Sequence, residues 1–310
     1  MSETRATAFG LDIRADRDLP FLSASTVAPT GRMLEVVLED GLGESWPASA
    51  QLISDQQLPE GGVNFQIEKS SGGDYRIWGP AYGTHVLRGD GRQLWGSLDE
   101  AGIDPWQRLL VAQALPFAAV LRGLEVLHAS AAVLDGGAIA FAGLSGSGKT
   151  SLALELCRRG AEFLADDVLT LELGEELLAH PGAPIAAVDR GEAERLQAAG
   201  TSIGEVLAAD RREIVQRVSP RAEPAPLQAV FLLERREDGP AAPHFEPAAE
   251  AQALLASTFN LVLADPARLA RLLDVCSLAA AGRVERVLFG PEVDATQLGA
   301  AVGERIGLPQ

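Results

Sequence analysis

The first hundred residues contain short stretches in which apolar and polar positions alternate. Residues 33–40, 63–70, 75–79 and 84–90 have this alternation, or a composition rich in β-branched and aromatic side chains, and Gly, Pro, Ser and Asp separate them. Alternation with a period of two residues is typical of strands that bury one face. The pattern therefore predicts a β-rich N-terminal region over residues 1–104.

The period changes to that of a helix after this region. Apolar residues recur at helical spacing over residues 104–128, where Asp104 is a candidate N-cap and Pro105 suits the first helical position. Pro116 is expected to kink or divide this helix, because proline lacks the backbone N–H that a helix interior needs. The helix is predicted to open a second region, residues 105–310.

A succession of strand, loop, helix and strand follows. Strands are predicted over 127–134 and 138–143, joined by an Asp-Gly-Gly turn, and the second strand is apolar almost throughout, as a buried central strand is. An amphipathic helix over 150–160 ends at a glycine, and a further buried strand covers 161–173. This succession predicts an α/β fold for the second region.

The rest of the chain continues the mixed pattern. Residues 180–200 are predicted to form a loop and a short helix, and residues 210–228 are polar, rich in arginine and broken by prolines, which indicates an exposed loop. The later expected elements are a strand over 227–235, helices over 247–260 and 265–282 with Asp265 capping the second, a strand over 283–290 and a closing helix over 294–307.

Composition and charge narrow the class of protein. The 310 residues carry a net charge of −17, and an acidic surface repels nucleic acids and anionic membranes. No apolar run reaches the roughly 18 residues of a membrane span, and the N-terminus lacks the basic-then-apolar layout of a signal peptide. Cys157 and Cys276 are the only cysteines, so no disulfide framework is encoded. We expect a cytoplasmic protein without nucleic-acid or membrane partners.

The octapeptide GLSGSGKT, from Gly143 to Thr150, matches the phosphate-loop pattern G-x-x-x-x-G-K-[ST]. Its glycines allow backbone amides to turn toward phosphate oxygens, and the helix that begins near Lys149 adds its partial positive charge. Lys149 can reach the β- and γ-phosphates, and Thr150 offers a hydroxyl to Mg²⁺. The cofactors predicted from this pattern are ATP and Mg²⁺. The predicted nucleotide-binding residues are Gly143, Leu144, Ser145, Gly146, Ser147, Gly148, Lys149, Thr150 and Ser151.

Two adjacent carboxylates follow at the next strand. Asp166 and Asp167 end the apolar run F-L-A-D-D, at a place where a carboxylate lies near the γ-phosphate. One of them can hold Mg²⁺, directly or through water, while the other accepts a proton from an acceptor hydroxyl. His128 lies on the hairpin before the loop strand, where a lone histidine is more often structural than catalytic. These residues leave open which aspartate has which role.

Residues 127–172 resemble the catalytic core of the HPr kinase/phosphorylase family. That family has a histidine on the hairpin before the phosphate loop, a helix that ends in Arg-Gly, and a strand that ends in Ala-Asp-Asp. The counterparts here are His128, Arg159-Gly160 and Ala165-Asp166-Asp167, and the spacing from Thr150 to the aspartates agrees. The fold that the resemblance implies is an α/β phosphate-loop kinase domain with a β-rich N-terminal region.

The resemblance implies Mg²⁺-dependent transfer of the γ-phosphoryl group of ATP to a serine hydroxyl. It places His128, Lys149, Asp166 and Asp167 in the catalytic site, with Asp166 as the proton acceptor, assisted by His128. Thr150 and Asp167 are the implied metal ligands, and Asp167 is also the alternative candidate for the base. A homo-oligomer is compatible with the resemblance.

Outside this core the sequence departs from the family. The family's metal-binding stretch E-I-R-G has a loose counterpart in V-D-R-G-E-A-E, where Asp189 or Glu192 would supply the carboxylate. The segment with which the family binds the HPr protein is not recognisable. The N-terminal region and the strand at 226–235 look more like divergent relatives found beside peptide-modification genes, which include kinases of lasso-peptide precursors. The expected acceptor is therefore a hydroxyl of a peptide, a protein or a small molecule.

Two further points are left as alternatives. Arg190, Arg211, Arg212 and Arg221 lie in the polar stretch after the aspartates, where they either stabilise the transferring phosphoryl group or belong to a solvated, charge-balancing loop.

A nucleotide-binding regulatory module without catalysis is the main alternative to a kinase. An ATPase that drives motion is a weaker one, because no hydrophobic strand ends in Asp-Glu.

Overall fold

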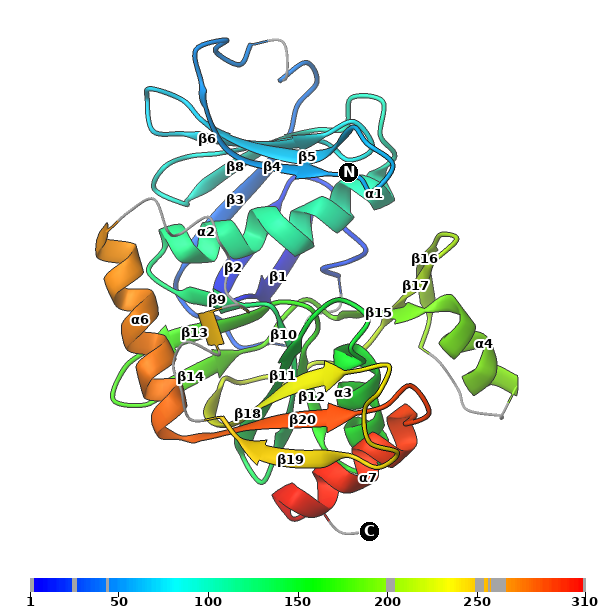
Figure 1. Cartoon of the computed structure of the whole chain (residues 1–310). Helices are drawn as coiled ribbons and strands as arrows, with labels where there is room; N and C mark the ends of the chain where they lie inside the picture. Colours follow the sequence, from blue (N-terminus) through cyan, green and yellow to red (C-terminus); the bar gives the residue numbers. More distant parts are fainter. Residues whose placement is uncertain are drawn as a thin grey trace. The chain divides into compact units, whose positions relative to one another are not determined.

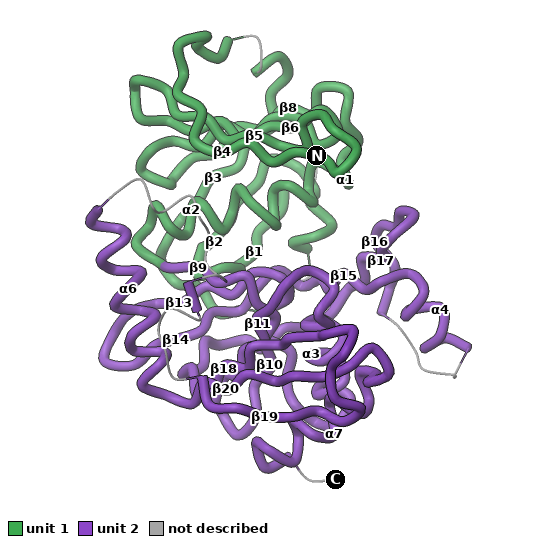
Figure 2. Tube along the Cα trace, viewed as in Figure 1, with its two compact units in different colours: residues 1–124 green, residues 125–310 purple. Residues whose placement is uncertain are grey.

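The chain folds into a mixed α/β structure (Figure 1). The computed structural model describes residues 3–23, 27–42, 45–198, 204–248, 254–255, 257 and 266–308. The chain divides into two compact units, unit 1 (residues 1–124) and unit 2 (residues 125–310), which Figure 2 shows in separate colours. No helix among the described residues is long and apolar enough to span a lipid bilayer.

Unit 1 is built on one sheet. Its strands are β1 (Thr4–Ala8), β2 (Leu11–Ala15), β3 (Met33–Leu38), β4 (Gln51–Gln57), β5 (Val63–Lys69), β6 (Tyr75–Gly79), β7 (Gly83–Leu87) and β8 (Gln93–Ser97). Among the described residues the order across this eight-stranded sheet is β1-β2-β3-β8-β7-β6-β5-β4. Strands β2, β3 and β8 run parallel to one another, and the other neighbours are antiparallel.

Alternating burial explains the strands that the sequence pattern identifies. In β6, Tyr75 and Ile77 are buried while Arg76 and Trp78 on the opposite face are half-buried, as the two-residue period requires. The predicted strands do not include β1, β2, β4 or β8. Strand β4 is an exposed edge of mostly polar residues, and β8 is interrupted by Gly96, so neither shows a clear alternation.

A helical segment covers one face of this sheet. It consists of α1 (Ile103–Leu109), the π-helical turn η1 (Leu110–Ala114) and α2 (Leu115–Leu121). Trp106 is fully buried, and its ring stacks on the His85 ring with the centroids 4.5 Å apart. The Trp106 Nε1 donates to the Thr84 carbonyl at 3.2 Å. The Phe117 ring meets the Tyr75 ring edge-on, with the centroids 4.7 Å apart.

These contacts explain where the first unit ends. The sequence pattern assigns the helical segment to the second region, with a boundary between residues 104 and 105, whereas the first compact unit extends to residue 124. Helical periodicity reveals that a segment is a helix, but not which sheet receives its apolar face. Here Trp106 and Phe117 pack on strands of unit 1, which places the segment in that unit.

The start and the middle of this helical segment differ from the prediction. Gly102 is the N-cap, without a side-chain cap bond, and Asp104 already lies in the first helical turn, so the predicted Asp104 cap is wrong. Pro116 lies near the start of α2, just after the π-helical turn, in which the Leu115 N–H donates to the Leu110 carbonyl. The wider turn accommodates the missing N–H of proline, because its hydrogen bonds reach one residue further back.

The main sheet of unit 2 contains nine strands within the described residues. They are β9 (Glu125–Leu127), β10 (Ala129–Leu134), β11 (Gly137–Gly143), β12 (Glu162–Ala165), β13 (Leu169–Leu173), β14 (Leu177–His180), β18 (Ala225–Arg235), β19 (His244–Pro247) and β20 (Arg283–Phe289). The order is β12-β10-β11-β18-β14-β13-β9, and β20 pairs with both β18 and β19. The hairpin of β10 and β11 turns at Asp135 and Gly136, both with positive φ, as the Asp-Gly-Gly signal predicts.

Chain direction brings several strand ends to one edge of this sheet. Strand β11 runs parallel to β18, and β18 runs parallel to β20. Strand β10 is antiparallel to both β11 and β12, so β12 points the same way as β11. The carboxyl ends of β11 and β12 and the amino end of β10 therefore lie together. We call this place the loop edge, because β11 leads there into the loop 143–148.

The stretch 161–173, predicted as one strand, is two. Strand β12 ends at Ala165 and β13 begins at Leu169. Asp167, between them, has a φ of 62°, in the left-handed region that an aspartate can adopt in a turn. The two aspartates therefore occupy a turn at the loop edge, and their side chains are not bound by the alternation of a strand.

Helices cover both faces of the main sheet of unit 2 (Figure 1). Helices α3 (Lys149–Arg158) and α7 (Ala295–Ile306) pack on one face, and α6 (Pro266–Ala281) packs on the other. Strand β11 contributes to both cores: its alanines share a cluster with α6, while Ile139 and Phe141 share a cluster with α3 and α7. This double burial explains why the strand is apolar throughout.

Helix α7 packs against α3, the helix that follows the loop 143–148. A Cβ at Gly299 of α7 would overlap the Glu155 side chain of α3. The Arg159 guanidinium also donates to the Thr296 carbonyl at 3.2 Å. Helix α7 begins with a capping box, in which Asp294 and Gln297 bond each other's backbone N–H.

A smaller, three-stranded sheet packs against α3. Its strands are β15 (Ile185–Asp189), β16 (Val206–Ala209) and β17 (Glu213–Arg217), in the order β15-β17-β16, and α4 (Arg190–Ala198) follows β15. Leu154 of α3 packs against Val188, Ala193 and Ile214 of this part. The predicted exposed loop over 210–228 is therefore wrong, because it contains β17 and the start of β18. The charged residues there flank three consecutive buried positions.

The later predictions largely correspond to observed elements. The expected strands at 227–235 and 283–290 are β18 and β20, and the expected helices at 265–282 and 294–307 are α6 and α7. Most of the predicted helix over 247–260, and Asp265, lie outside the described residues.

Substitution of Gly96 by alanine tests the packing of the helical segment on unit 1. A Cβ at Gly96 would overlap the Trp106 ring, so we expect Gly96→Ala to lower the free energy of unfolding by about 2 kcal/mol. All four tryptophans lie in unit 1, so urea unfolding followed by tryptophan fluorescence reports on this unit. Gly72→Ala is the control, since a Cβ there lies 3.6 Å from the Ser70 Oγ. Equal stability of the two variants would contradict the packing.

Candidate functional site

The loop at the end of β11 has a backbone that only glycine adopts easily. Gly143 has a φ of 152°, and a Cβ there would lie 2.5 Å from the Leu233 carbonyl oxygen of β18. Gly148, the N-cap of α3, is left-handed with a φ of 90°. The first N–H groups of a helix have no partner within the helix, so the start of α3 presents donors and a partial positive charge at the loop edge.

Lys149 is folded back onto this loop. Its side chain is buried, and Nζ donates to the carbonyl oxygens of Gly143 at 3.0 Å and Leu144 at 3.2 Å. Burial lowers the pKa of Lys149, and the nearby charges of Asp167 and Asp166 oppose that shift. The ammonium group is thus held inside the curve of the loop by two neutral acceptors.

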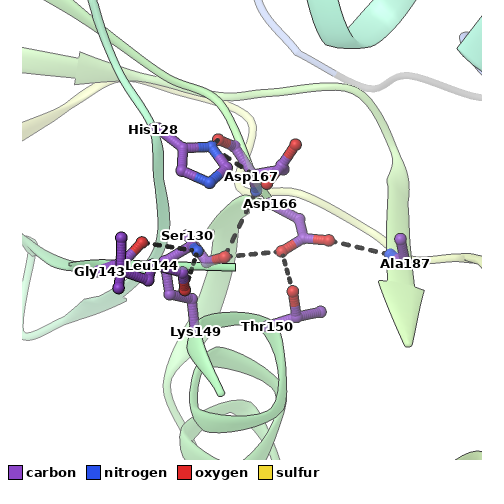
Figure 3. Close-up of polar contacts among 9 residues, drawn as sticks. All are labelled: His128, Ser130, Gly143, Leu144, Lys149, Thr150, Asp166, Asp167 and Ala187. Atoms are coloured by element: carbon purple, nitrogen blue, oxygen red, sulfur yellow. Dashed lines mark hydrogen bonds and ion pairs between the residues drawn. The ribbon is translucent and has the colours of Figure 1, made fainter. Parts of the chain in front are cut away.

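The Asp166 carboxylate joins three elements at the loop edge (Figure 3). Its Oδ1 accepts hydrogen bonds from Ser130 Oγ of β10 and Thr150 Oγ1 of α3, both at 2.7 Å. Its Oδ2 accepts from the Ala187 N–H of β15 at 2.9 Å. One side chain therefore connects the hairpin, the loop helix and the smaller sheet.

The surroundings of Asp166 favour its neutral form. Burial raises its pKa to about 6, and the adjacent Asp167 adds to that increase. The hydrogen bonds from Ser130, Thr150 and Ala187 act in the opposite direction, because they stabilise the charged carboxylate. A nearby cation would therefore be a favourable neighbour for this group.

Asp167 turns away from Asp166 and meets His128. The His128 Nδ1 lies 3.0 Å from the Asp167 carbonyl oxygen and 3.2 Å from its Oδ1 (Figure 3). A carbonyl oxygen only accepts hydrogen bonds, so Nδ1 carries the proton, and Nε2 is the accepting nitrogen of the neutral ring. Both side chains are accessible, at 38% exposure for His128 and 54% for Asp167.

Glu192 and Asp189 are the two candidates for a further metal-binding carboxylate, and their contacts differ. The Ser151 hydroxyl, next to Thr150 on α3, donates to Glu192 Oε2. Asp189 Oδ1 accepts from the Glu192 N–H at 3.1 Å, and so supports the first turn of α4. The structure therefore brings Glu192 to α3, the helix after the loop, whereas Asp189 accepts a hydrogen bond from the start of its own neighbouring helix, α4.

The predicted arginines are not gathered at the loop edge. The Arg190 Nε donates to the Asp210 carbonyl at 2.9 Å, within the smaller sheet and its helix. The Arg221 Nη1 lies 2.6 Å from Glu162 Oε1, at the opposite end of β12 from Asp166. Arg211 and Arg212 lie in the turn between β16 and β17.

The remaining loop residues differ in exposure. Leu144 is 85% exposed, and Ser145 and Gly146 are also exposed. The Ser147 Oγ is buried and has no hydrogen-bond partner within the described part of the chain. In that part, no group of three or more His, Cys, Asp or Glu side chains is arranged to hold a metal ion alone.

Two groups of the site are missing from the sequence prediction. Ser130 had a usable signal, because it is a polar residue in an apolar strand and lies two positions from His128, on the same face. Ala187 contributes only its backbone N–H, and no side-chain pattern can announce such a donor.

Among known proteins, the chain has likenesses in the solved structures. No family model matches the chain, and no curated protein matches it. Among the solved structures, the HPr(Ser) kinase/phosphatase from Coxiella burnetii is similar, with 15% sequence identity over 59% of this chain and 94% of that chain and a TM-score of 0.31. With a TM-score this low, the function has to be argued from the residues of the site.

Replacement of Asp166 by asparagine should change how stability depends on pH. The pKa of Asp166 is about 6 in the folded chain, against an ordinary value of 3.8. The stability that the bound proton provides is therefore fully present below about pH 4 and is lost as the pH rises to about 6. We expect Asp166→Asn to remove this loss, which amounts to about 3 kcal/mol.

The measurement is urea unfolding in metal-free buffer between pH 4 and pH 7, followed by circular dichroism because unit 2 contains no tryptophan. Parallel stability curves for the variant and the unchanged chain would contradict the assignment.

Ser130→Ala removes one of the two hydroxyl donors of the Asp166 carboxylate. Loss of a hydrogen bond to a partly buried charged group should lower the free energy of unfolding by about 2 kcal/mol at pH 7. The loss should be smaller at pH 4, where the carboxyl group is neutral. Ser145→Ala, at an exposed serine, should leave stability unchanged. An equal loss at both pH values would show that Ser130 contributes by packing and not by holding the charge.

Proposed function

We propose that the protein is an ATP- and Mg²⁺-dependent kinase that transfers the γ-phosphoryl group to a hydroxyl of a peptide, a protein or a small molecule, with a serine hydroxyl as the expected acceptor. The observation that carries this proposal is the position of the Asp166 carboxylate, which contacts Thr150 of the loop helix and Ser130 of the strand that follows His128. Groups suited to bind phosphate, to hold a metal ion and to accept a proton thus lie together at the loop edge of the main sheet of unit 2.

The loop residues 143–151 are suited to a nucleotide triphosphate. Lys149 is held at the loop by carbonyl oxygens, which it can exchange for the more strongly accepting oxygens of the β- and γ-phosphates. The buried Ser147 hydroxyl, which has no partner among the described residues, is a further donor available to a phosphate oxygen.

The oxygen donors of the site fit Mg²⁺. Thr150 Oγ1 and Asp166 are already in contact, and Asp167 is an accessible carboxylate beside them. Mg²⁺ is commonly held by one or two carboxylates together with phosphate oxygens and water, so a closed set of protein ligands is not required. We assign Thr150 and Asp166 to the ion, with Asp167 within its surroundings. Bound Mg²⁺ would neutralise negative charge on the phosphates.

His128 is well suited to accept the proton of the acceptor hydroxyl. Its Nε2 is the unprotonated nitrogen, and Asp167 would stabilise the imidazolium that forms. In the proposed step the hydroxyl O–H bond breaks, the proton passes to Nε2, and the oxygen forms a bond to the γ-phosphorus as ADP leaves. The resemblance assigns the role of base to Asp166. That carboxylate already accepts three hydrogen bonds, which makes it a weaker candidate than His128 Nε2.

A transfer experiment tests this function. The full chain is incubated with γ-labelled ATP and Mg²⁺ in a cell extract separated by molecular size. We expect label in a new peptide, protein or small molecule, and none with Lys149→Ala or Asp166→Asn. Asp166→Asn should still bind ATP, because Lys149 and the loop backbone are unchanged. Asp238→Asn, at an exposed carboxylate outside the site, is the matched control.

Binding of ATP without transfer into any fraction would overturn the kinase assignment and support a nucleotide-binding regulatory module. Full transfer by Asp166→Asn would contradict the role of that carboxylate.

His128→Gln separates the proton acceptor from the nucleotide site. Loss of a general base should lower the rate of transfer by about 100-fold or more, while the affinity for ATP stays the same because His128 contacts Asp167 and not the loop. Transfer rates are measured with the labelled acceptor, and ATP affinity by calorimetry. A rate within a factor of two of the unchanged chain would assign the proton to another group.

A further inference from the structure

The turn between β16 and β17 presents two arginines without a side-chain partner. Arg211 and Arg212 are both exposed. Within the described residues, neither guanidinium has a hydrogen bond, an ion pair or an aromatic contact. Figure 1 shows β16 and β17 as a hairpin that extends beyond the main sheet of unit 2. We refer to the turn of this hairpin, residues 210–212, as the arginine turn.

The absence of partners sets these two residues apart from the rest of unit 2. Every other arginine that the structure describes in this unit has a side-chain partner, as Arg217 has in Glu205 at 2.8 Å and Arg271 in Glu125 at 2.6 Å. The chain has 43 acidic and 26 basic residues, so carboxylates are not scarce. Two adjacent guanidinium groups are nevertheless left available to an anionic ligand.

Backbone hydrogen bonds hold the arginine turn at the start of α4. The Arg190 N–H donates to the Arg212 carbonyl at 2.8 Å, and the Arg190 Nε donates to the Asp210 carbonyl at 2.9 Å. The Asp210 Oδ1 accepts from the N–H groups of Arg212 at 2.7 Å and Glu213 at 2.9 Å. The backbone of the turn is therefore fixed, while the two guanidinium groups point away from these contacts into solvent.

The smaller sheet connects the arginine turn to the loop edge. The Ala187 N–H of β15 donates to Asp166 Oδ2 at 2.9 Å. Ala187 pairs with Val215 of β17, which follows Arg212 by three residues, so about 10 Å of strand separates Arg212 from the contact with Asp166. An extended polypeptide covers this distance with about three residues. A polypeptide at the loop edge can therefore also reach the arginine turn.

We propose that the arginine turn binds acidic side chains of the acceptor, so that the acceptor is a peptide or a protein and not a small molecule. This inference rests on the kinase function proposed above. Guanidinium groups donate in a planar fork that matches a carboxylate, and groups of arginines are a recurrent means of recognising acidic segments. The distance to the loop edge places the acidic residues about three or more positions from the accepting hydroxyl.

Peptide binding tests the site without the transfer reaction. The probes are two fluorescein-labelled peptides that differ in one respect. In the first, a single serine lies between two runs of glutamate, with alanine spacers of about three residues; in the second, glutamine replaces each glutamate. Fluorescence anisotropy is measured with the full chain in the absence of nucleotide. We expect the glutamate peptide to bind about tenfold more tightly or better, with an affinity that falls as NaCl is raised.

Charge reversal locates the site. Arg211→Glu and Arg212→Glu should each weaken binding of the glutamate peptide by about tenfold or more. The control is Arg158→Glu, at the carboxyl end of α3, because the loop edge lies at the amino end of that helix; it should change the affinity by less than about twofold. Equal affinity for the two peptides, no binding of the glutamate peptide, or equal weakening by Arg212→Glu and Arg158→Glu would overturn the proposal.

Transfer shows whether the bound polypeptide is the acceptor. With the acceptor labelled in the cell extract, Arg212→Glu should raise the acceptor KM by about tenfold. The kcat and the affinity for ATP should not change, because the proposed nucleotide contacts lie in residues 143–151. An unchanged acceptor KM would overturn the proposal and leave the kinase function intact. Binding of the glutamate peptide by a chain that transfers no phosphate would instead overturn the kinase function and, with it, the acceptor role of the bound peptide.

Discussion

The arrangement at the loop edge depends on one partly buried carboxylate. Asp166 accepts hydrogen bonds from Ser130 on β10, from Thr150 on α3 and from the Ala187 N–H on β15. These three elements come from distant parts of unit 2, and no backbone pairing holds all of them together. A carboxylate that accepts hydrogen bonds from three elements restricts each donor to one position. The carboxylate therefore fixes the loop helix relative to the hairpin and to the smaller sheet, while its own desolvation raises its pKa to about 6.

The direction of β10 makes this convergence possible. Because β10 is antiparallel to both β11 and β12, its first residues lie where those two strands end. A histidine placed just before β10 thus reaches the same edge as the loop after β11 and the aspartates after β12. In a sheet where all neighbours are parallel, the start of one strand and the end of the next would lie at opposite edges. The reversal of one strand places His128 beside Asp167.

The sequence predicts the parts of the molecule that repeat a pattern or match a motif. Residues 143–150, which match the phosphate-loop pattern, and the pair Asp166 and Asp167 are recognisable because their spacing is local, and the structure gathers them at the loop edge. Packing partners are not visible in this way. Helical periodicity identifies the segment around Trp106 but does not reveal that it covers the sheet of unit 1. The Ala187 N–H is a donor that any residue except proline would supply, so no sequence signal marks it.

The packing of α7 on α3 has a consequence for how the chain acquires its site during synthesis. The loop and its helix leave the ribosome when little more than half of the 310 residues has been made. The strand beside β11 is β18, and the helix beside α3 is α7, which ends at Ile306. Domains generally fold as units once their residues are available. A nascent chain therefore has the loop 143–148 long before it has the neighbours that hold this loop in shape, and the loop edge reaches its final form only after α7 has emerged.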